Sequence, residues 1–258
     1  MKGVHLWLVP DPSIATTVLA EHAESVLSSE ELTRCQSHRL PKGQRVFLLT
    51  RIVLRELLSH HYPDIQPTQW IFSRSANGKP IVGNPNLNIS FNLSHAGSMI
   101  ALAFAENVSI GVDIEHCERE VDVDGLSGRF FSEAEHKLLM SLPVPARQQR
   151  FLTLWTMKEA VVKASGLGLA KALRDYEFII DEATGHLDFR QSHGRISEQG
   201  GPRWEVCAAM SGDYHVALAM SPTDDTSLHS DLTVRWFRWP DRIDCREVDM
   251  FYTAKLSD

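Results

Sequence analysis

The sequence predicts an α+β protein built from two similar lobes, because the same order of elements occurs twice along the chain. Ser28 and Ser132, 104 residues apart, each open a serine-x-x-glutamate pattern that is typical of a helix start. The pair Phe47-Leu48 recurs at the same spacing as Phe151-Leu152, each time within an apolar helix pattern. Finally, the strand-like run Ile-Ala-Leu-Ala at 100–103 has a counterpart, Val-Ala-Leu-Ala, at 216–219. These matches predict a duplicated unit with pseudo-twofold symmetry.

The first half supplies the elements of one lobe. Alternating residues at 4–9 predict an opening strand, and the helix start at 28–31 is followed by a Leu-Pro-Lys-Gly turn at 40–43. Apolar residues at 45–60 share one broad face and predict a long helix. The remaining expectations are short strands at 70–73 and 89–93 around an Asn77-Gly78 turn, then a buried strand at 99–105.

The second half repeats this order and ends in an extension. A helix start at 132–135, a long helix from Phe151 and strands at 176–180 and 216–219 follow one another. Residues 221–230 are rich in Pro, Asp, Thr and Ser and predict a linker, and 231–239 predict an added edge strand. We therefore divide the chain into an N-terminal lobe (1–106), a C-terminal lobe (107–222) and an extension (223–258). A ligand site is expected in the cleft between the lobes.

Composition excludes several classes of protein. The sequence is 43% hydrophobic and 23% charged, as in globular proteins, and its net charge of −7 gives no support for nucleic-acid binding. Four distant cysteines without a C-x-x-C pair predict reduced thiols and no zinc site. Neither a signal peptide nor a run of about 18 apolar residues is found. We expect a cytoplasmic monomer without membrane contacts.

Two carboxylates lie close together in Gly-Val-Asp-Ile-Glu at 111–115. The β-branched residues of this segment predict a strand, so Asp113 and Glu115 project from the same face. Like charges side by side repel unless a cation neutralises them. A solvated acidic edge, continued by the carboxylates at 118, 120, 122 and 124, explains this segment equally well when it is taken alone.

A stripe of mixed character on the second long helix favours a site. At spacings i, i+3, i+4, i+7 and i+8 it gathers Trp155, Lys158, Glu159, Val162 and Lys163. The alternative is an ordinary surface pair of Glu159 with Lys163, worth about 0.3–0.5 kcal/mol. Three carboxylates from two elements suit Mg²⁺ with phosphate oxygens, and Lys163 could neutralise a leaving phosphate. These groups indicate phosphoryl or phosphopantetheinyl transfer.

The N-terminal half concentrates groups that bind anions. Each of them alone is more simply explained as a solvated charge or a polar turn residue. Their concentration in one lobe of an acidic chain predicts an anion site formed by Lys42, Arg45, Arg51, Arg55, Arg74, Lys79, Asn92, Ser94 and His95.

The segment 111–115, followed by Trp-Thr-Met-Lys-Glu-Ala-Val-Val-Lys at 155–163, resembles the signature of 4′-phosphopantetheinyl transferases. Asn-Gly-Lys-Pro at 77–80, Phe-Asn-Leu-Ser-His at 91–95 and Arg-Phe-Phe-Ser at 129–132 extend the resemblance over roughly residues 40–170. The two-lobed, single-chain, Sfp-like branch fits best. The resemblance implies the pseudo-twofold fold of that family and Mg²⁺-dependent transfer of 4′-phosphopantetheine from coenzyme A to a serine of an acyl or peptidyl carrier protein. Adenosine 3′,5′-bisphosphate would be released.

The resemblance also implies residue roles. Asp113, Glu115 and Glu159 would bind Mg²⁺, or Mn²⁺ in its place, and Glu159 would act as the base while Lys163 stabilises the leaving group. The implied contacts to coenzyme A are Lys42, Arg45, Arg74, Lys79, Ser94, His95, Lys158 and Lys163. The carrier protein would dock around Phe130. Exposure of Phe130 or Phe131 would favour docking there, and burial of both would favour an ordinary core.

Two alternative functions use the same residues. A Mg²⁺-dependent nucleotide pyrophosphatase would release adenosine phosphates without a carrier protein. A non-catalytic module that binds coenzyme A or a carrier protein would keep all of its function in Glu159→Ala.

Overall fold

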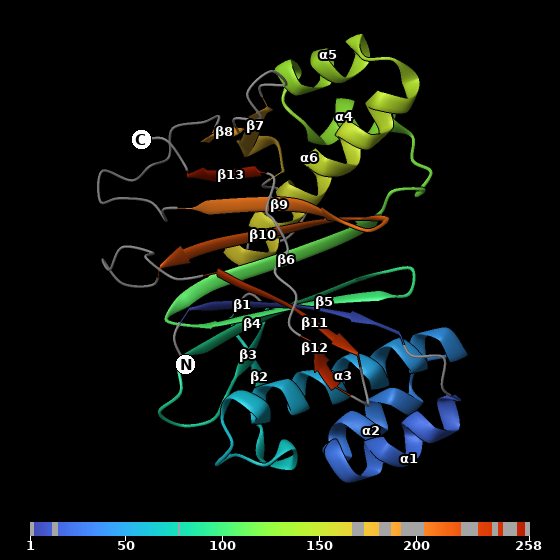
Figure 1. Cartoon of the computed structure of the whole chain (residues 1–258), viewed down its shortest axis with the longest axis vertical. Coiled ribbons are helices and arrows are strands. Elements are labelled where there is room, and N and C mark those ends of the chain that lie inside the picture. The colour runs from blue at the N-terminus through green and yellow to red at the C-terminus, as the bar shows by residue number, and fades with distance from the viewer. Residues whose placement is uncertain are drawn as a thin grey trace.

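The computed structural model describes residues 3–11, 15–76, 78–166, 173–180, 187–191, 204–222, 232–238, 242–244 and 252–255. These residues form four layers, in which two β-sheets lie against each other and helices cover the outer face of each sheet (Figure 1). Among the described residues, no helix has the length and apolar character needed to span a membrane.

The N-terminal lobe contains the larger sheet and three helices. The sheet has the strand order β12-β11-β1-β5-β4. Its strands are β1 (Val4–Pro10), β4 (Ile89–Ala96), β5 (Met99–Glu106), β11 (Leu232–Arg238) and β12 (Arg242–Asp244). The other elements of the lobe are α1 (Thr16–Val26), α2 (Ser29–Gln36), α3 (Pro41–His61), the short 3-10 helix η1 (Pro67–Gln69) and the hairpin of β2 (Phe72–Arg74) and β3 (Pro80–Val82).

The C-terminal lobe has a four-stranded sheet in the order β13-β9-β10-β6. Its strands are β6 (Val108–His116), β9 (Glu205–Ser211), β10 (Tyr214–Pro222) and β13 (Tyr252–Lys255). The other elements are α4 (Val123–Phe130), α5 (Glu133–Ser141), α6 (Val144–Ser165), η2 (Leu173–Asp175) and the hairpin of β7 (Tyr176–Ile180) and β8 (Leu187–Gln191).

The two lobes repeat one another, which confirms the predicted α+β duplication. The strand order β1-β5-β4 of the first sheet corresponds to β6-β10-β9 of the second. β1 pairs antiparallel with β5, as β6 does with β10. The helices α2 and α3 correspond to α5 and α6, and the β2–β3 hairpin corresponds to β7–β8.

Three apolar cores hold the four layers together. One lies between α1–α3 and the first sheet, another between α6 and the second sheet, and the third between the two sheets. The alternation of β1 shows why the strand is buried on both faces: Trp7 and Val9 belong to the helix-side core, whereas Leu6 and Leu8 belong to the core between the sheets. The packing of sheet on sheet fixes the lobes relative to each other.

A buried ion pair is also repeated. Both predicted serine-x-x-glutamate starts are capping boxes, at Ser28 and Ser132. The glutamate of the first box pairs with Arg55 at 2.7 Å, and Glu135 of the second pairs with Lys158 at 2.8 Å. Arg55 and Lys158 each also donate to two backbone carbonyls, so each buried cation is fully engaged in its own lobe.

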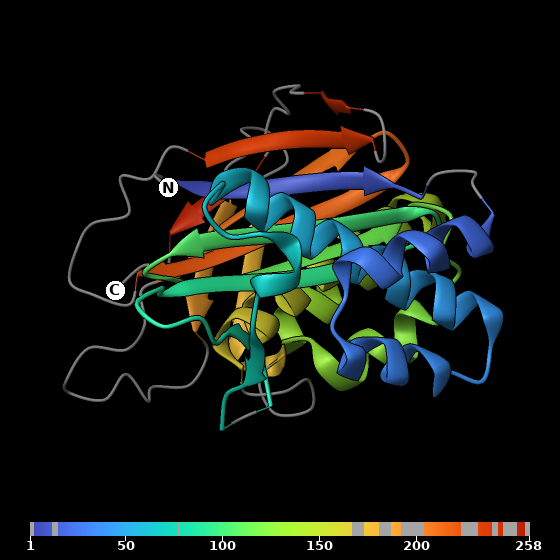
Figure 2. The ribbon, with the colours of Figure 1, turned by 90° about the horizontal axis from the view of Figure 1, so that it is seen from below.

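The extension departs from the prediction of an edge strand. β11 pairs parallel with β1 and lies between β1 and β12, so it is an inner strand (Figures 1 and 2). β13 joins the other sheet at β9. The extension therefore contributes strands to both sheets. The predicted linker begins within β10, which extends to Pro222, and its residues 223–230 lie outside the described part of the chain.

Candidate functional site

The two lobes meet where the free edges of their sheets face each other. β4 is the last strand of the first sheet and β6 is the last strand of the second. Side chains of the N-terminal lobe bind backbone groups on the edge of β6: Asn92 Oδ1 accepts the Val112 N–H at 2.9 Å, and Lys79 Nζ donates to the Ile110 carbonyl at 2.9 Å. Residues 110 and 112 are alternate positions of the strand and present their backbone groups to the same side.

A close approach between α6 and β6 depends on Gly111. A Cβ atom at this position would lie 2.1 Å from the Ala160 carbonyl oxygen and 2.4 Å from the Ala164 nitrogen. Only glycine therefore lets the helix backbone rest directly on the strand. This contact brings the carboxylates that follow Gly111 beside the charged residues of α6.

The seam between the lobes, where β4 lies beside β6, brings together Asp113 of β6, Lys163 of α6 and Ser94 of β4. Asp113 is 4% exposed, and its Oδ1 accepts from Lys163 Nζ at 2.6 Å and from Ser94 Oγ at 2.7 Å. Lys163 Nζ also donates to Ser94 Oγ at 3.0 Å. The second oxygen, Oδ2, is buried and has no hydrogen-bond partner among the described residues. A buried carboxylate oxygen without a partner is costly, so this atom is suited to receive a cation.

Glu115 and Glu159 share the electrostatic environment of Asp113. Burial, followed by repulsion from the Asp113 charge, raises the pKa of each of the two glutamates to about 7. The Arg119 guanidinium pairs with Glu115, whereas Glu159 is 7% exposed and makes no hydrogen bond with the described residues. Within the described ranges, no three or more His, Cys, Asp or Glu side chains are arranged as a group that could hold a metal ion. The three carboxylates are close enough to repel one another. Two of them are paired with cations of the protein, Asp113 with Lys163 and Glu115 with Arg119.

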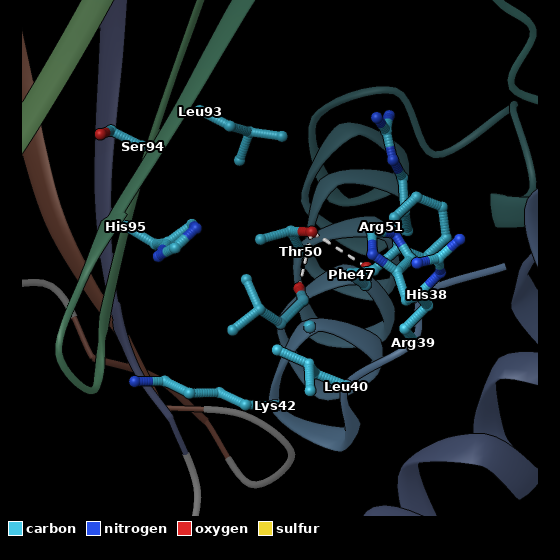
Figure 3. A pocket seen from close by; sticks show the side chains of 12 residues that line it. His38, Arg39, Leu40, Lys42, Phe47, Thr50, Arg51, Leu93, Ser94 and His95 are labelled. Carbon is cyan, nitrogen blue, oxygen red and sulfur yellow. Dashed lines mark hydrogen bonds between the residues drawn. The ribbon is translucent and has the colours of Figure 1, made fainter. Parts of the chain in front are cut away.

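A cavity of about 660 Å³ opens beside this cluster, between α3 and β4. Figure 3 shows His95 and Ser94 on the β4 side and Lys42 and Thr50 on the α3 side. Burial, and then the charges of Lys163 and Lys42, lower the pKa of His95. Ser94 stands in the wall of the cavity, and Figure 3 shows its hydroxyl on the side of β4 away from α3, where it binds Asp113. The carboxylate cluster therefore adjoins the cavity across β4.

Arg74 lines a second cavity, of about 500 Å³, which adjoins the first. The two cavities share Phe47 and Arg51, and the Arg51 guanidinium lies over the Phe47 ring at 5.6 Å. Burial lowers the pKa of Arg51. The structure thus divides the predicted anion binders, with Lys42 and His95 in one cavity and Arg74 in the other.

Further basic side chains, which no sequence motif predicts, also line these cavities. His38 and Arg39 line the first, and Arg34 lines the second. They lie in α2 and in the connection to α3, where the sequence carries no motif. Their position just before Lys42 is the signal that could have pointed to them.

Three predicted contact residues lie elsewhere. Arg45 binds Asp11 through Nε at 2.9 Å and lines neither cavity. Lys79 donates to two backbone carbonyls at the seam. Lys158 is 0% exposed, and its ammonium binds Glu135 and the carbonyls of Leu173 and Tyr176. All three of its hydrogens are used inside the core, so the expectation that Lys158 contacts coenzyme A is wrong.

The two phenylalanines at the end of α4 differ in burial. Phe131 is 2% exposed and stacks on Phe151, so it is a core residue. Phe130 is half-buried, and the centre of its ring lies 5.9 Å from that of Trp155. The Arg129 guanidinium lies over the Phe130 ring, 5.0 Å from its centre. The surface near Phe130 therefore offers one partly exposed aromatic ring.

Comparison with known proteins agrees with this geometry. The family model of the 4′-phosphopantetheinyl transferase superfamily matches residues 109–219, and a model of the N-terminal part of 4′-phosphopantetheinyl transferase matches residues 15–107. The 4′-phosphopantetheinyl transferase HetI of Nostoc sp. is 37% identical over 172 residues, which are 65% of this chain and 70% of that protein. The enzyme psf-1 of Bacillus pumilus is 31% identical over 163 residues, 63% of this chain and 67% of its own. Sfp of Bacillus subtilis is 29% identical over 196 residues, 73% of this chain and 85% of its own. The chain therefore belongs to the 4′-phosphopantetheinyl transferase superfamily, in its Sfp-like branch.

Proposed function

We propose that this chain transfers 4′-phosphopantetheine from coenzyme A to a serine of an acyl or peptidyl carrier protein, with Mg²⁺, and releases adenosine 3′,5′-bisphosphate. The observation that carries the proposal is the cluster of Asp113, Lys163 and Ser94, which adjoins both Glu159 and the cationic cavity. In the reaction, the serine oxygen bonds to the phosphorus that bears pantetheine. The bond from that phosphorus to the oxygen of the adenosine 5′-phosphate breaks, and the serine loses its proton.

The cavity between α3 and β4 is the proposed site of the adenosine end of coenzyme A. Its volume of about 660 Å³ lies within the ordinary range for ligand pockets, about 300–1,000 Å³. Lys42 and His95 would bind phosphate oxygens there, and Ser94, in the cavity wall, binds Asp113 across β4. Arg74 and Arg34 in the adjoining cavity, behind Arg51, would add to the positive potential.

Asp113, Glu115 and Glu159 would supply the charge and the oxygen donors for a hard divalent cation, although among the described residues they are not arranged as a ready-made metal group. Two observations support this assignment: Asp113 Oδ2 is buried without a partner, and the pKa values of both glutamates are raised in the way that a cation would reverse. When bound, Mg²⁺ would neutralise charge on the diphosphate of coenzyme A. The same donors would accept Mn²⁺.

The protein's own groups would hold and move the proton and balance the charge. Glu159 is buried and makes no hydrogen bond with the described residues, so its carboxylate, ionised beside the bound cation, would accept the proton of the serine hydroxyl. Lys163 would place its positive charge beside the phosphate that leaves with adenosine. Ser94 binds both Lys163 and Asp113 and would keep this pair in place.

The carrier protein would approach along the C-terminal lobe near Phe130. The half-buried ring of Phe130 is the group that would meet the carrier protein there. The acidic net charge of −7 argues against a nucleic-acid partner, and we propose a cytoplasmic, monomeric enzyme.

Release of adenosine 3′,5′-bisphosphate tests this function against its rivals. The protein is incubated with coenzyme A and Mg²⁺, with and without an apo carrier protein, and the nucleotide is quantified by chromatography. Release that requires the carrier and stops with EDTA is the expected result. Release without a carrier would identify a pyrophosphatase. Binding of coenzyme A without any release would identify a non-catalytic module.

A further inference from the structure

Lys79 bridges the two elements that carry the reacting groups, although it belongs to the other lobe. Its Nζ donates to the Ile110 carbonyl of β6 and to the Ala164 carbonyl of α6, both at 2.9 Å. No other hydrogen bond of the Lys79 side chain is found among the described residues. Lys79 lines neither cavity, so this geometry differs from the ligand contact that the sequence resemblance implies.

The position of both acceptors explains why a lysine is suited to this place. Ile110 presents its carbonyl on the edge of β6 opposite β10, where none of the described strands pairs with it. Ala164 lies in the last turn of α6, whose final carbonyls have no partner within the helix and form the negative end of the helix dipole. One ammonium group satisfies both carbonyls and carries the charge that the helix end favours.

The backbone around Lys79 is held rigidly enough to direct the side chain. The Ser75 N–H donates to the Lys79 carbonyl at 2.8 Å, and the Lys79 N–H donates to Ser75 Oγ at 3.2 Å. Burial lowers the pKa of the Lys79 ammonium to about 8. These hydrogen bonds hold the Lys79 backbone beside Ser75, and the ammonium lies half-buried at the seam between the lobes.

The two acceptors lie close in sequence to Asp113 and Lys163. Ala164 directly follows Lys163, and Ile110 precedes Gly111, the residue that lets α6 rest on β6. The bridge therefore fixes the end of α6 against β6 beside the 2.6 Å contact of Lys163 with Asp113. Removing it would leave the helix end free to shift, and a displacement of about 1 Å at a reacting group can cost about 10²-fold in rate.

We propose that Lys79 is a positioning residue, which reaches across the lobe interface and sets the placement of Lys163 relative to Asp113 by tying Ile110 of β6 to Ala164 of α6. This inference rests on the proposed function. It assigns Lys79 an effect on the turnover of bound substrate, whereas a lysine that contacts the nucleotide would change the affinity for coenzyme A.

Lys79→Met tests the inference, because methionine keeps much of the side-chain length and removes both hydrogen bonds. Turnover is measured by carrier mass and coenzyme A affinity by calorimetry, with Lys137→Met on exposed α5 as the control. We expect kcat to fall about 10- to 100-fold, the Kd for coenzyme A to stay within about twofold, and Lys79→Arg to recover part of kcat. A raised Kd with unchanged kcat would overturn the proposal in favour of a ligand contact.

A second measurement separates positioning from simple support of the fold. In the Lys163→Ala background, Lys79→Met should cost less than about threefold in kcat, because the group that it positions is already gone. Equal losses in both backgrounds would overturn the proposal, as would a lowered melting temperature with unchanged turnover of the folded enzyme. Should Lys79→Met not fold, Lys79→Gln, which keeps one donor, takes its place in both comparisons. Wild-type protein that fails to transfer would contradict the proposed function itself, whereas active wild type with an unaffected Lys79 variant would contradict this inference alone.

Discussion

Lys163 Nζ lies 2.6 Å from Asp113 Oδ1, and this ion pair joins α6 to β6 at the seam between the two lobes. Ser94 of the N-terminal lobe binds both partners, so the pair depends on all three elements. A buried ion pair that still leaves one carboxylate oxygen without a partner contributes little to stability in itself. Its position beside a cationic cavity is better explained by function.

Lys163→Ala should therefore impair the reaction more than the binding of coenzyme A. Removing a charge that acts on the leaving phosphate should lower kcat about 10²- to 10³-fold. The Kd for coenzyme A, measured by calorimetry, should rise less than about tenfold. Lys137→Ala, on the exposed face of α5, is the control. A variant that turns over normally but binds coenzyme A poorly would reduce Lys163 to a docking charge.

Glu159 should make the metal-free protein less stable as the pH rises. Its folded-state pKa, about 7, lies above the ordinary value of 4.5, so the folded state binds the proton more tightly than the unfolded state. The free energy of unfolding should thus fall between about pH 4.5 and pH 7, by an amount on the order of 3 kcal/mol. Urea unfolding in EDTA measures this slope.

In the same experiment, Glu159→Gln should reduce the pH dependence to the part that Glu115 contributes, and it should be more stable than wild type at pH 8. It should also lose at least about 10²-fold in transfer, because glutamine cannot accept the proton. An unchanged slope would show that the Glu159 carboxyl is solvated, and near-normal turnover with added Mg²⁺ would remove it from the proposed mechanism.

Gly111→Ala should separate α6 from β6. Its Cβ would meet the Ala160 carbonyl oxygen at 2.1 Å, which forces the helix away and should cost about 1–3 kcal/mol of unfolding free energy together with most of the activity. Gly128→Ala in α4 is a matched control, since its Cβ would meet nothing nearer than 3.7 Å. Thermal unfolding with both variants measures the difference. Equal stability of the two variants would contradict the close approach.

Lys158→Met should damage stability without a specific effect on coenzyme A. Removing the lysine leaves the Glu135 carboxylate buried and unpaired, which should cost about 3–5 kcal/mol. Lys158→Met combined with Glu135→Gln should recover part of that loss, since the stranded charge is then absent. Urea unfolding compares the two. A weakened affinity for coenzyme A in folded Lys158→Met, with unchanged stability, would restore the role that the sequence resemblance implies.

The repeat was predictable from sequence because both copies kept the residues that begin their helices. Ser28 and Ser132 form the same capping box, and the apolar positions that follow keep the period of a helix. The sequence does not predict the strands β3, β8, β9, β12 and β13. α1 (Thr16–Val26) was also missed, since it starts without a side-chain cap. The parallel pairing of β11 with β1 joins residues from opposite ends of the chain, which no local pattern can indicate.

The site was predictable in part for a similar reason. Strand alternation and helix spacing predict that Asp113, Glu115, Glu159 and Lys163 lie near one another. In the structure Lys163 binds Asp113, whose charge also acts on the two glutamates. Helix spacing also grouped Lys158 with them, yet the two lysines of α6 lie in different surroundings, one in the core with Glu135 and one at the seam with Asp113. A position on one helical stripe does not specify the direction in which a lysine side chain extends. The direction depends on which carboxylate lies nearest, and for these two lysines the nearest carboxylates differ.

The mass of an apo carrier protein, measured after incubation with this protein, coenzyme A and Mg²⁺, tests the central claim most directly. The account predicts a gain equal to one phosphopantetheine per carrier, lost when EDTA is added, when the carrier serine is replaced by alanine, or when Glu159→Ala replaces the wild type. An unchanged carrier mass across acyl and peptidyl carriers, with folded protein and intact coenzyme A, would contradict it.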